Sequence, residues 1–276
     1  MGTFQAGRQK WTGIDDAQST GAIRAAFDAG INTFDSAEAY GKGHAERILG
    51  AALSDVRNKV VLATKVSPNR LGYDQVLNAC HGSLKRLGTD YIDLYQIHWP
   101  SGSFGGKVVP IEETMAAMIR LKEQGKIRAI GVSNFSQCQV QEAAELGPVD
   151  SVQPAFSLFW RHAADDAMTY CNDHGISILA YSPMAQGLLT GKFGPNHKFM
   201  KGDHRSKNKL FQPKNYSRIQ KALARLRPLA KELAVSLAEL ALAWVTSHPG
   251  TCAIAGARNA DQATLNARAA WVSLSA

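Results

Sequence analysis

Two runs of apolar residues, Val60-Val-Leu-Ala-Thr-Lys65 and Tyr91-Ile-Asp-Leu-Tyr-Gln-Ile-His98, indicate how this chain folds. Both are dominated by apolar residues without strict alternation, which is typical of β-strands buried on both faces. The helical stretch Tyr73 to Leu87 lies between them. A strand, a helix and a second strand joined by short connections predict a parallel pair with a right-handed crossover.

The same alternation extends along the chain. Six further segments have the composition of strands: Gly2 to Gln5, Ile31 to Asp35, Ile127 to Val132, Ser151 to Ala155, Ile176 to Tyr181 and Thr251 to Ala255. Further helical stretches lie between them. The first can be capped by Asp15 or Asp16 and runs through Ile23 to Phe27 up to Gly30, and the others are Ile111 to Gln124, Ser136 to Leu146 and Ala163 to His174.

This pattern predicts an α/β fold, a (β/α)8 TIM barrel. The 276 residues fit the roughly 250 that are typical of such barrels. Because no linker, repeat or low-complexity tract interrupts the chain, we expect residues 1–276 to form a single domain. A doubly wound open sheet is the alternative architecture, but no G-x-G-x-x-G motif follows the first strand.

Four residues with useful chemistry stand at or just past predicted strand ends: Asp35, Tyr40, Lys65 and His98. The C-terminal ends of barrel strands meet at one mouth, where active sites lie. A lysine ammonium there lowers a phenol pKa that is normally about 10, an aspartate keeps the lysine charged, and a histidine can hydrogen-bond a substrate oxygen. These four residues together predict a site in which an acid protonates an alkoxide while a hydride is delivered from elsewhere. Taken singly, each residue also fits a structural role as a turn, packing or strand-end residue.

The net charge of +8 is concentrated in one segment. Twelve of the 31 Lys and Arg residues but only one acidic residue, Asp203, lie between Thr190 and Lys231. This predicts a long basic loop after the seventh strand and an anionic partner. Nucleic acid is disfavoured because no aromatic platform or recognition helix accompanies the charge. The alternative is that Arg218 to Lys231 form only a solvated helix face.

The chain has no stretch near the roughly 18 apolar residues of a membrane helix and no apolar signal-peptide region at its start. Its four cysteines are too scattered for a metal knuckle or redox pair. We therefore expect a cytoplasmic protein with no membrane partner, no metal and reduced cysteines.

Six motifs in order make the chain resemble the aldo-keto reductases over nearly its whole length. They are Phe34-Asp35-Ser-Ala-Glu-Ala-Tyr40-Gly41, Thr64-Lys65, Ile97-His98, Gly131-Val-Ser-Asn-Phe135, Tyr181-Ser-Pro-Met-Ala-Gln-Gly-Leu-Leu-Thr-Gly191-Lys192 and Gly256-Ala-Arg-Asn259. The resemblance implies a barrel that transfers a hydride between a nicotinamide cofactor and a carbonyl or alcohol. It assigns Tyr40 as general acid and base, Lys65 and Asp35 as the residues that tune it, and His98 as the residue that orients the carbonyl.

The resemblance also implies a set of cofactor contacts. Ser133, Asn134 and Gln153 would hold the nicotinamide carboxamide, and Tyr181 would stack on its ring. The phosphates and adenosine would be held by the segments after the last two strands, with candidates Gly187, Leu188, Lys192, Gly256, Arg258, Gln262 and Asn266. A guanidinium can bind phosphate bidentately, so Arg258 is the candidate for a 2′-phosphate, which favours NADPH and leaves NADH possible.

Members of the family usually begin with a hairpin that seals the barrel bottom, and we expect it to be missing from this chain. Phe4, Trp11 and Trp99 are candidate walls of the substrate pocket, with ordinary packing as the alternative. The predicted activity is reduction of an aldehyde or ketone with a small-molecule substrate. The rival hypothesis is a non-catalytic regulatory subunit that binds the cofactor. Oligomeric state stays open.

Overall fold

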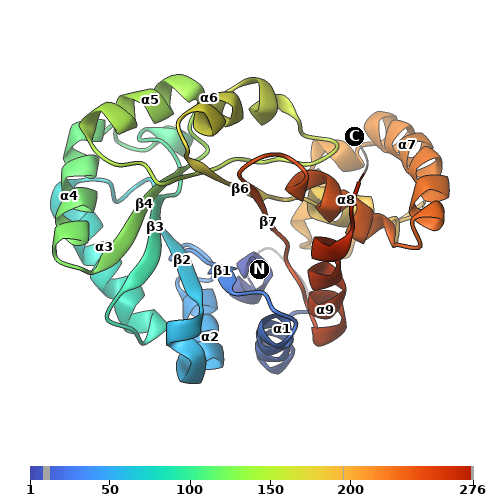
Figure 1. Ribbon diagram of the computed structural model, residues 1–276, viewed down its shortest axis with the longest axis horizontal. Coiled ribbons are helices and arrows are strands. Elements are labelled where there is room, and N and C mark those ends of the chain that lie inside the picture. Colours follow the sequence, from blue (N-terminus) through green and yellow to red (C-terminus); the bar gives the residue numbers. More distant parts are fainter. Residues whose placement is uncertain (9–12, 195, 275–276) are drawn as a thin grey trace.

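The computed structural model describes residues 1–8, 13–194 and 196–274 of the 276. In this part of the chain seven parallel strands pair in sequence order around a nearly closed barrel (Figure 1). They are β1 (Thr33–Asp35), β2 (Val61–Val66), β3 (Ile92–Ile97), β4 (Ile127–Ser133), β5 (Ser151–Gln153), β6 (Ser177–Tyr181) and β7 (Thr251–Ile254). The predicted α/β barrel is confirmed, with its sheet parallel throughout.

The gap between β1 and β7 is filled by the N-terminal residues. Gly2 forms parallel bridges to both Asp35 and Gly256, and its N–H donates to the carbonyl of Ala255 at 2.9 Å. The prediction of a strand from Gly2 to Gln5 was wrong beyond these bridges, because residues Phe4–Gly7 turn into a 3-10 helix. No hairpin is formed within residues 1–8.

Helices surround the sheet, as Figure 1 shows for α2 to α6 on one side and α7 to α9 on the other. Their bounds are α1 (Asp16–Asp28), α2 (His44–Leu53), α3 (Tyr73–Leu87), α4 (Ile111–Glu123), α5 (Gln137–Leu146), α6 (Ala167–Asp173), α7 (Pro213–Glu232), α8 (Leu237–Thr246) and α9 (Ala260–Arg268). The expected cap of α1 is Asp15, whose carboxylate accepts from the N–H of Gln18. No helix in these described ranges is long and apolar enough to cross a membrane.

The structure corrects the bounds of one predicted helix and defines the basic loop. The helix expected from Ala163 to His174 is broken: residues His162–Asp165 form a 3-10 turn and α6 begins only at Ala167. Asp166 sits at the break because its carboxylate accepts from the N–H of Gln137 in α5. The basic loop after β6 contains three short 3-10 segments and ends where α7 begins, at Pro213.

The barrel interior is stacked in layers. A small apolar cluster fills the lower part, formed by Ala63, Leu94, Leu179 and Ile254. Two residues further along, the inward side chains become polar, and Lys65 of β2 lies in register with Gln96 of β3. Gly131 leaves room for this layer, because a Cβ there would come within 2.9 Å of Gln96. The fold therefore supports a buried polar layer at the C-terminal ends of the strands.

Candidate active site

Asp35 and Lys65 form a buried ion pair at the centre of the polar layer. Lys65 is completely buried, and its Nζ donates to Asp35 Oδ1 at 2.6 Å and to the carbonyl of Ser36 at 2.8 Å. Burial by itself lowers the pKa of Lys65, but attraction to Asp35 and Tyr40 outweighs it and the pKa is raised. The lysine is therefore charged, as the sequence predicted.

Tyr40 lies over this ion pair. Its ring centroid is 5.2 Å from Lys65 Nζ, 5.0 Å from the ring of Phe4 and 5.6 Å from the ring of His98. Burial raises the pKa of Tyr40 more than Lys65 lowers it, and Asp35 raises it further. The expected lowering by Lys65 is present, but the prediction of a lowered pKa was wrong in its net direction. The phenol is protonated at neutral pH and can donate a proton.

His98 is held as a neutral imidazole. Burial, helped by the nearby Lys65 charge, lowers the pKa of His98 to about 3. Its backbone is fixed by two hydrogen bonds, from its N–H to Val66 and from Asn134 Nδ2 to its carbonyl. A neutral imidazole next to Tyr40 can donate one N–H to a substrate oxygen without changing the charge of the site.

We expect the His98 imidazole to show no titration between about pH 5 and 8, where an unperturbed histidine changes charge. Its protonation would place a second cation near Lys65 in a buried site. The measurement is an NMR titration of the histidine ring protons, with a His98→Asn variant to assign the signal. A midpoint near the usual value of about 6.5 would show that the ring is solvated and charged in acid.

Two buried glutamines complete the environment of Asp35. Gln96 and Gln153 both donate from Nε2 to Asp35 Oδ2, at 3.2 and 3.0 Å, and Gln153 also donates to Gln96 Oε1 at 3.0 Å. Gln96 was missed by the sequence analysis. An available signal was its place two residues before His98, which puts both side chains on the same face of the strand.

The three predicted carboxamide-binding residues do lie together. Ser133 Oγ donates to the carbonyl of Gln153 at 2.9 Å, and Asn134 Nδ2 donates to Ser133 Oγ at 3.0 Å. The Tyr181 hydroxyl donates to Asn134 Oδ1 at 2.8 Å, and burial, helped by Tyr40, raises the pKa of Tyr181 to about 12. These contacts join the nicotinamide candidates to the catalytic candidates in one network.

The phosphate candidates lie after β6 and β7. The N–H of Gly187 donates to Met184 at 2.9 Å, and the N–H of Lys192 reaches Thr190 Oγ1 at 3.3 Å, so both amides have acceptors within the loop. The side chain of Leu188 is fully buried.

After β7, two residues predicted to contact the adenosine also hydrogen-bond within the turn. Gln262 Oε1 accepts from the N–H of Arg258 at 3.0 Å, and Asn266 Nδ2 donates to the carbonyl of Gly256 at 3.1 Å. Arg258 itself donates to the carbonyl of Gly13 at 3.0 Å.

Three cations approach one another at these two segments. The pKa of Lys192 is lowered mainly by burial, and repulsion by Arg205 and Arg258 lowers it further. Arg205 is anchored by Asp203, at 2.6 Å, and packs on the ring of Phe199. Repulsion between like charges in a folded protein favours binding of an anion that would relieve it.

Two of the three candidate residues for the substrate pocket lie in the described part of the chain. Phe4 contacts the ring of Tyr40, and Trp99 packs edge-on against Phe104 at 5.1 Å between ring centroids. Phe104 is 79% exposed, so this pair forms an open aromatic edge after β3. Trp11 lies outside the described residues.

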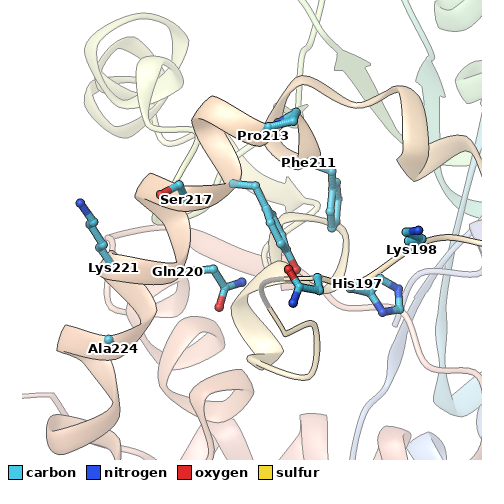
Figure 2. Close-up of a pocket in the computed structure, with 10 residues that line it drawn as sticks. His197, Lys198, Phe211, Pro213, Ser217, Gln220, Lys221 and Ala224 are labelled. Carbon is cyan, nitrogen blue, oxygen red and sulfur yellow. The ribbon is translucent and has the colours of Figure 1, made fainter.

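A hollow of about 630 Å³ lies elsewhere, between the first half of α7 and the preceding loop. Figure 2 shows His197, Phe211 and Gln220 around it. None of the predicted site residues lines it, so we place the active site at the buried polar layer and not here. In the described ranges no group of His, Cys, Asp and Glu is arranged to hold a metal.

The chain belongs to the aldo/keto reductase family, whose family model matches residues 1–276. It is 39% identical to aldo-keto reductase YhdN of Bacillus subtilis (strain 168), over 95% of this chain and 81% of that protein. Its fold matches glycerol dehydrogenase AKR11B4 from Gluconobacter oxydans with a TM-score of 0.87 and 35% identity, over 95% and 83% of the two chains. It also matches an aldo-keto reductase from Klebsiella pneumoniae in complex with NADPH, with a TM-score of 0.80, 30% identity and coverage of 100% and 86%.

Proposed function

We propose that this protein is an NADPH-dependent oxidoreductase that reduces an aldehyde or ketone to an alcohol, reversibly. The observation that carries the proposal is the assembly of a protonated Tyr40, the charged Lys65–Asp35 pair and a neutral His98 within one layer. A proton donor and a neutral hydrogen-bond donor at one point suit a carbonyl oxygen that gains negative charge.

Each residue has a distinct task. The His98 N–H and the Tyr40 hydroxyl orient the carbonyl oxygen between them. When bound, the dihydronicotinamide supplies a hydride to the carbonyl carbon. Tyr40 gives its proton to the oxygen, and the resulting tyrosinate is stabilised by the Lys65 ammonium until solvent returns a proton. In the reverse direction the tyrosinate accepts the alcohol proton.

The donor set fits a nicotinamide cofactor. Ser133, Asn134 and Gln153 present hydroxyl and amide groups in a network that reaches His98 and Asp35, and Tyr181 offers an aromatic face. Both Gln153 Nε2 hydrogens have acceptors in Asp35 and Gln96, so its Oε1 would accept from the carboxamide. Lys192, Arg205 and Arg258 would balance the phosphates, and the NADPH complex of the Klebsiella pneumoniae relative supports this choice.

We expect Arg258→Ala to weaken NADPH binding by roughly 10- to 100-fold, the scale of a hydrogen bond to a charged group, and to leave NADH binding almost unchanged. Only NADPH carries the 2′-phosphate that a guanidinium fork fits. Quenching of tryptophan fluorescence measures both affinities, and the wild-type preference for NADPH should shrink as salt rises.

Arg218→Ala is the control, since it removes the same charge from an exposed position on α7. Equal wild-type affinities for the two cofactors, or equal losses in Arg258→Ala, would remove Arg258 from this role and favour NADH or dual use.

The function is tested by a panel of small aldehydes and ketones with each cofactor, followed by the absorbance of reduced nicotinamide. Turnover that depends on Tyr40 supports the reductase. Tightly held cofactor without turnover would favour the regulatory subunit instead. A small carbonyl substrate and a cytoplasmic location remain part of this proposal.

A further inference from the structure

Glu38 is a buried carboxylate between the two catalytic segments. It is 8% exposed, and Oε1 accepts from the N–H of Ser67 at 2.9 Å while Oε2 pairs with Arg70 Nη1 at 2.7 Å. Arg86 approaches the same oxygen to 4.0 Å. Its backbone N–H also points to the carbonyl of Lys65, at 3.4 Å. The carboxylate is therefore fully engaged, and its contacts reach beyond its own segment.

These contacts join the segments that carry Tyr40 and Lys65. Glu38 stands two residues before Tyr40, within a turn closed by the Tyr40 N–H and the carbonyl of Ala37 at 3.0 Å. Ser67 stands two residues after Lys65. A shift of the Glu38 carboxylate relative to Ser67 would therefore change the separation of the phenol and the ammonium.

On its other side the tyrosine turn is held by hydrogen bonds from the N–H groups of His44 and Ala45 to the carbonyls of Gly41 and Tyr40, at 3.1 and 3.2 Å, and it packs closely against Gly7. Gly41 has a φ of +64°, and a Cβ there would lie 2.4 Å from the carbonyl oxygen of Gly7. None of these contacts reaches β2. Backbone hydrogen bonds from Ser36 to Ala63 and from Glu38 to Lys65 join the start of the segment to β2, and the Glu38 side chain extends this connection to Ser67, just past the end of β2.

We propose that Glu38 is a positioning residue that sets the distance between the Tyr40 hydroxyl and the Lys65 ammonium. The inference rests on the proposed function for the role of Tyr40 as the acid. Glu38 does not act on the substrate. It acts through the two segments that it joins.

The proposal predicts the direction in which the pKa of Tyr40 changes when the link through Glu38 is lost. The groups that act on this phenol are Lys65, Asp35, His98 and Tyr181, and of the two charged ones only Lys65 favours the tyrosinate. A turn released from Ser67 would move away from Lys65, so the pKa of Tyr40 would rise further. The attraction between a tyrosinate and the Lys65 ammonium weakens as their separation grows, so the rise in the pKa of Tyr40 should follow the extent of the withdrawal. Loss of the Glu38 charge without movement would lower the pKa, since a neighbouring negative charge disfavours a tyrosinate.

Two variants separate position from charge. Glu38→Asp keeps the charge but shortens the reach by one methylene, and Glu38→Gln keeps the length and the acceptor for Ser67 but removes the charge. We expect Glu38→Asp to raise the pKa of Tyr40 and to lower kcat by up to roughly 100-fold, the scale of a misplacement near 1 Å. Cofactor affinity should stay unchanged. Glu38→Gln should keep kcat near that of the wild type and should not raise the pKa of Tyr40, because loss of the charge alone lowers it.

The matched control is Asp93→Glu. Asp93 is a 9% exposed carboxylate that accepts from the N–H of Leu62 at 2.9 Å and pairs with Arg57 at 2.7 Å, at the opposite end of β2. Asp93 makes the same kinds of contact as Glu38, but far from the mouth of the barrel. Asp93→Glu should lower stability without moving the titration of Tyr40.

The titration is followed by NMR of isotope-labelled tyrosine, assigned with Tyr40→Phe, and by the alkaline limb of the reduction rate. An unshifted pKa in Glu38→Asp, an equal upward shift in Glu38→Gln, or the same shift in Asp93→Glu would each overturn the inference. The NMR titration needs no substrate, so it still decides the positioning role if the wild type reduces no carbonyl.

Discussion

Tyr40→Phe is expected to lower the rate of carbonyl reduction by roughly 100- to 10,000-fold, the usual contribution of a positioned acid. The phenol hydroxyl is the only proton donor proposed for the alkoxide, while the ring contacts with Phe4 and His98 survive the substitution. Cofactor affinity should therefore stay close to that of the wild type. Steady-state kinetics and a fluorescence titration of the cofactor measure the two quantities separately.

Tyr170→Phe provides the control for loss of a tyrosine hydroxyl, because Tyr170 lies in α6 and its ring stacks on that of His174, which is not a predicted catalytic residue. It should reduce carbonyls like the wild type. If Tyr40→Phe kept most of its kcat, another residue would have to be the acid, and the assignment of the site would fall with it.

Lys65→Met is expected to be about as damaging as Tyr40→Phe, and the double variant little worse than either. Lys65 acts on the reaction only through the phenol, and residues that act as one unit give strongly non-additive losses. Multiplicative losses in the double variant would mean that Lys65 works independently of Tyr40.

Because Lys65 forms a buried ion pair with Asp35, the stability of the Lys65→Met variant must be measured together with its rate. Methionine at position 65 would leave the buried Asp35 carboxylate with only the two glutamine donors, and breaking a buried pair from one side typically costs about 3–5 kcal/mol. The double variant Asp35→Asn with Lys65→Met removes both charges. It should recover thermal stability while the rate stays low, which separates loss of chemistry from loss of fold.

The bounds of the strands show how much of the fold the local sequence pattern predicts. The runs of β-branched residues located β2, β3, β4 and β6 to within a residue or two, because a strand buried on both faces needs a continuous apolar run. The same approach failed at Gly2, where the pairing depends on the distance between β1 and β7 and not on local composition. It failed again at Asp166, whose side chain bonds to a different helix.

By itself, the sequence determined the barrel class, the family and the candidates at the strand ends. These follow from residue order, since side chains that directly follow parallel strands must meet at one end of the sheet. The tertiary structure alone decided what those side chains do to one another. Gln96 reaches Asp35 across 61 positions of the chain, and Glu38 joins the turn of Tyr40 to the segment after Lys65. It also reversed the expected direction of the Tyr40 pKa, because burial outweighs one neighbouring charge and burial is a property of the whole packed barrel.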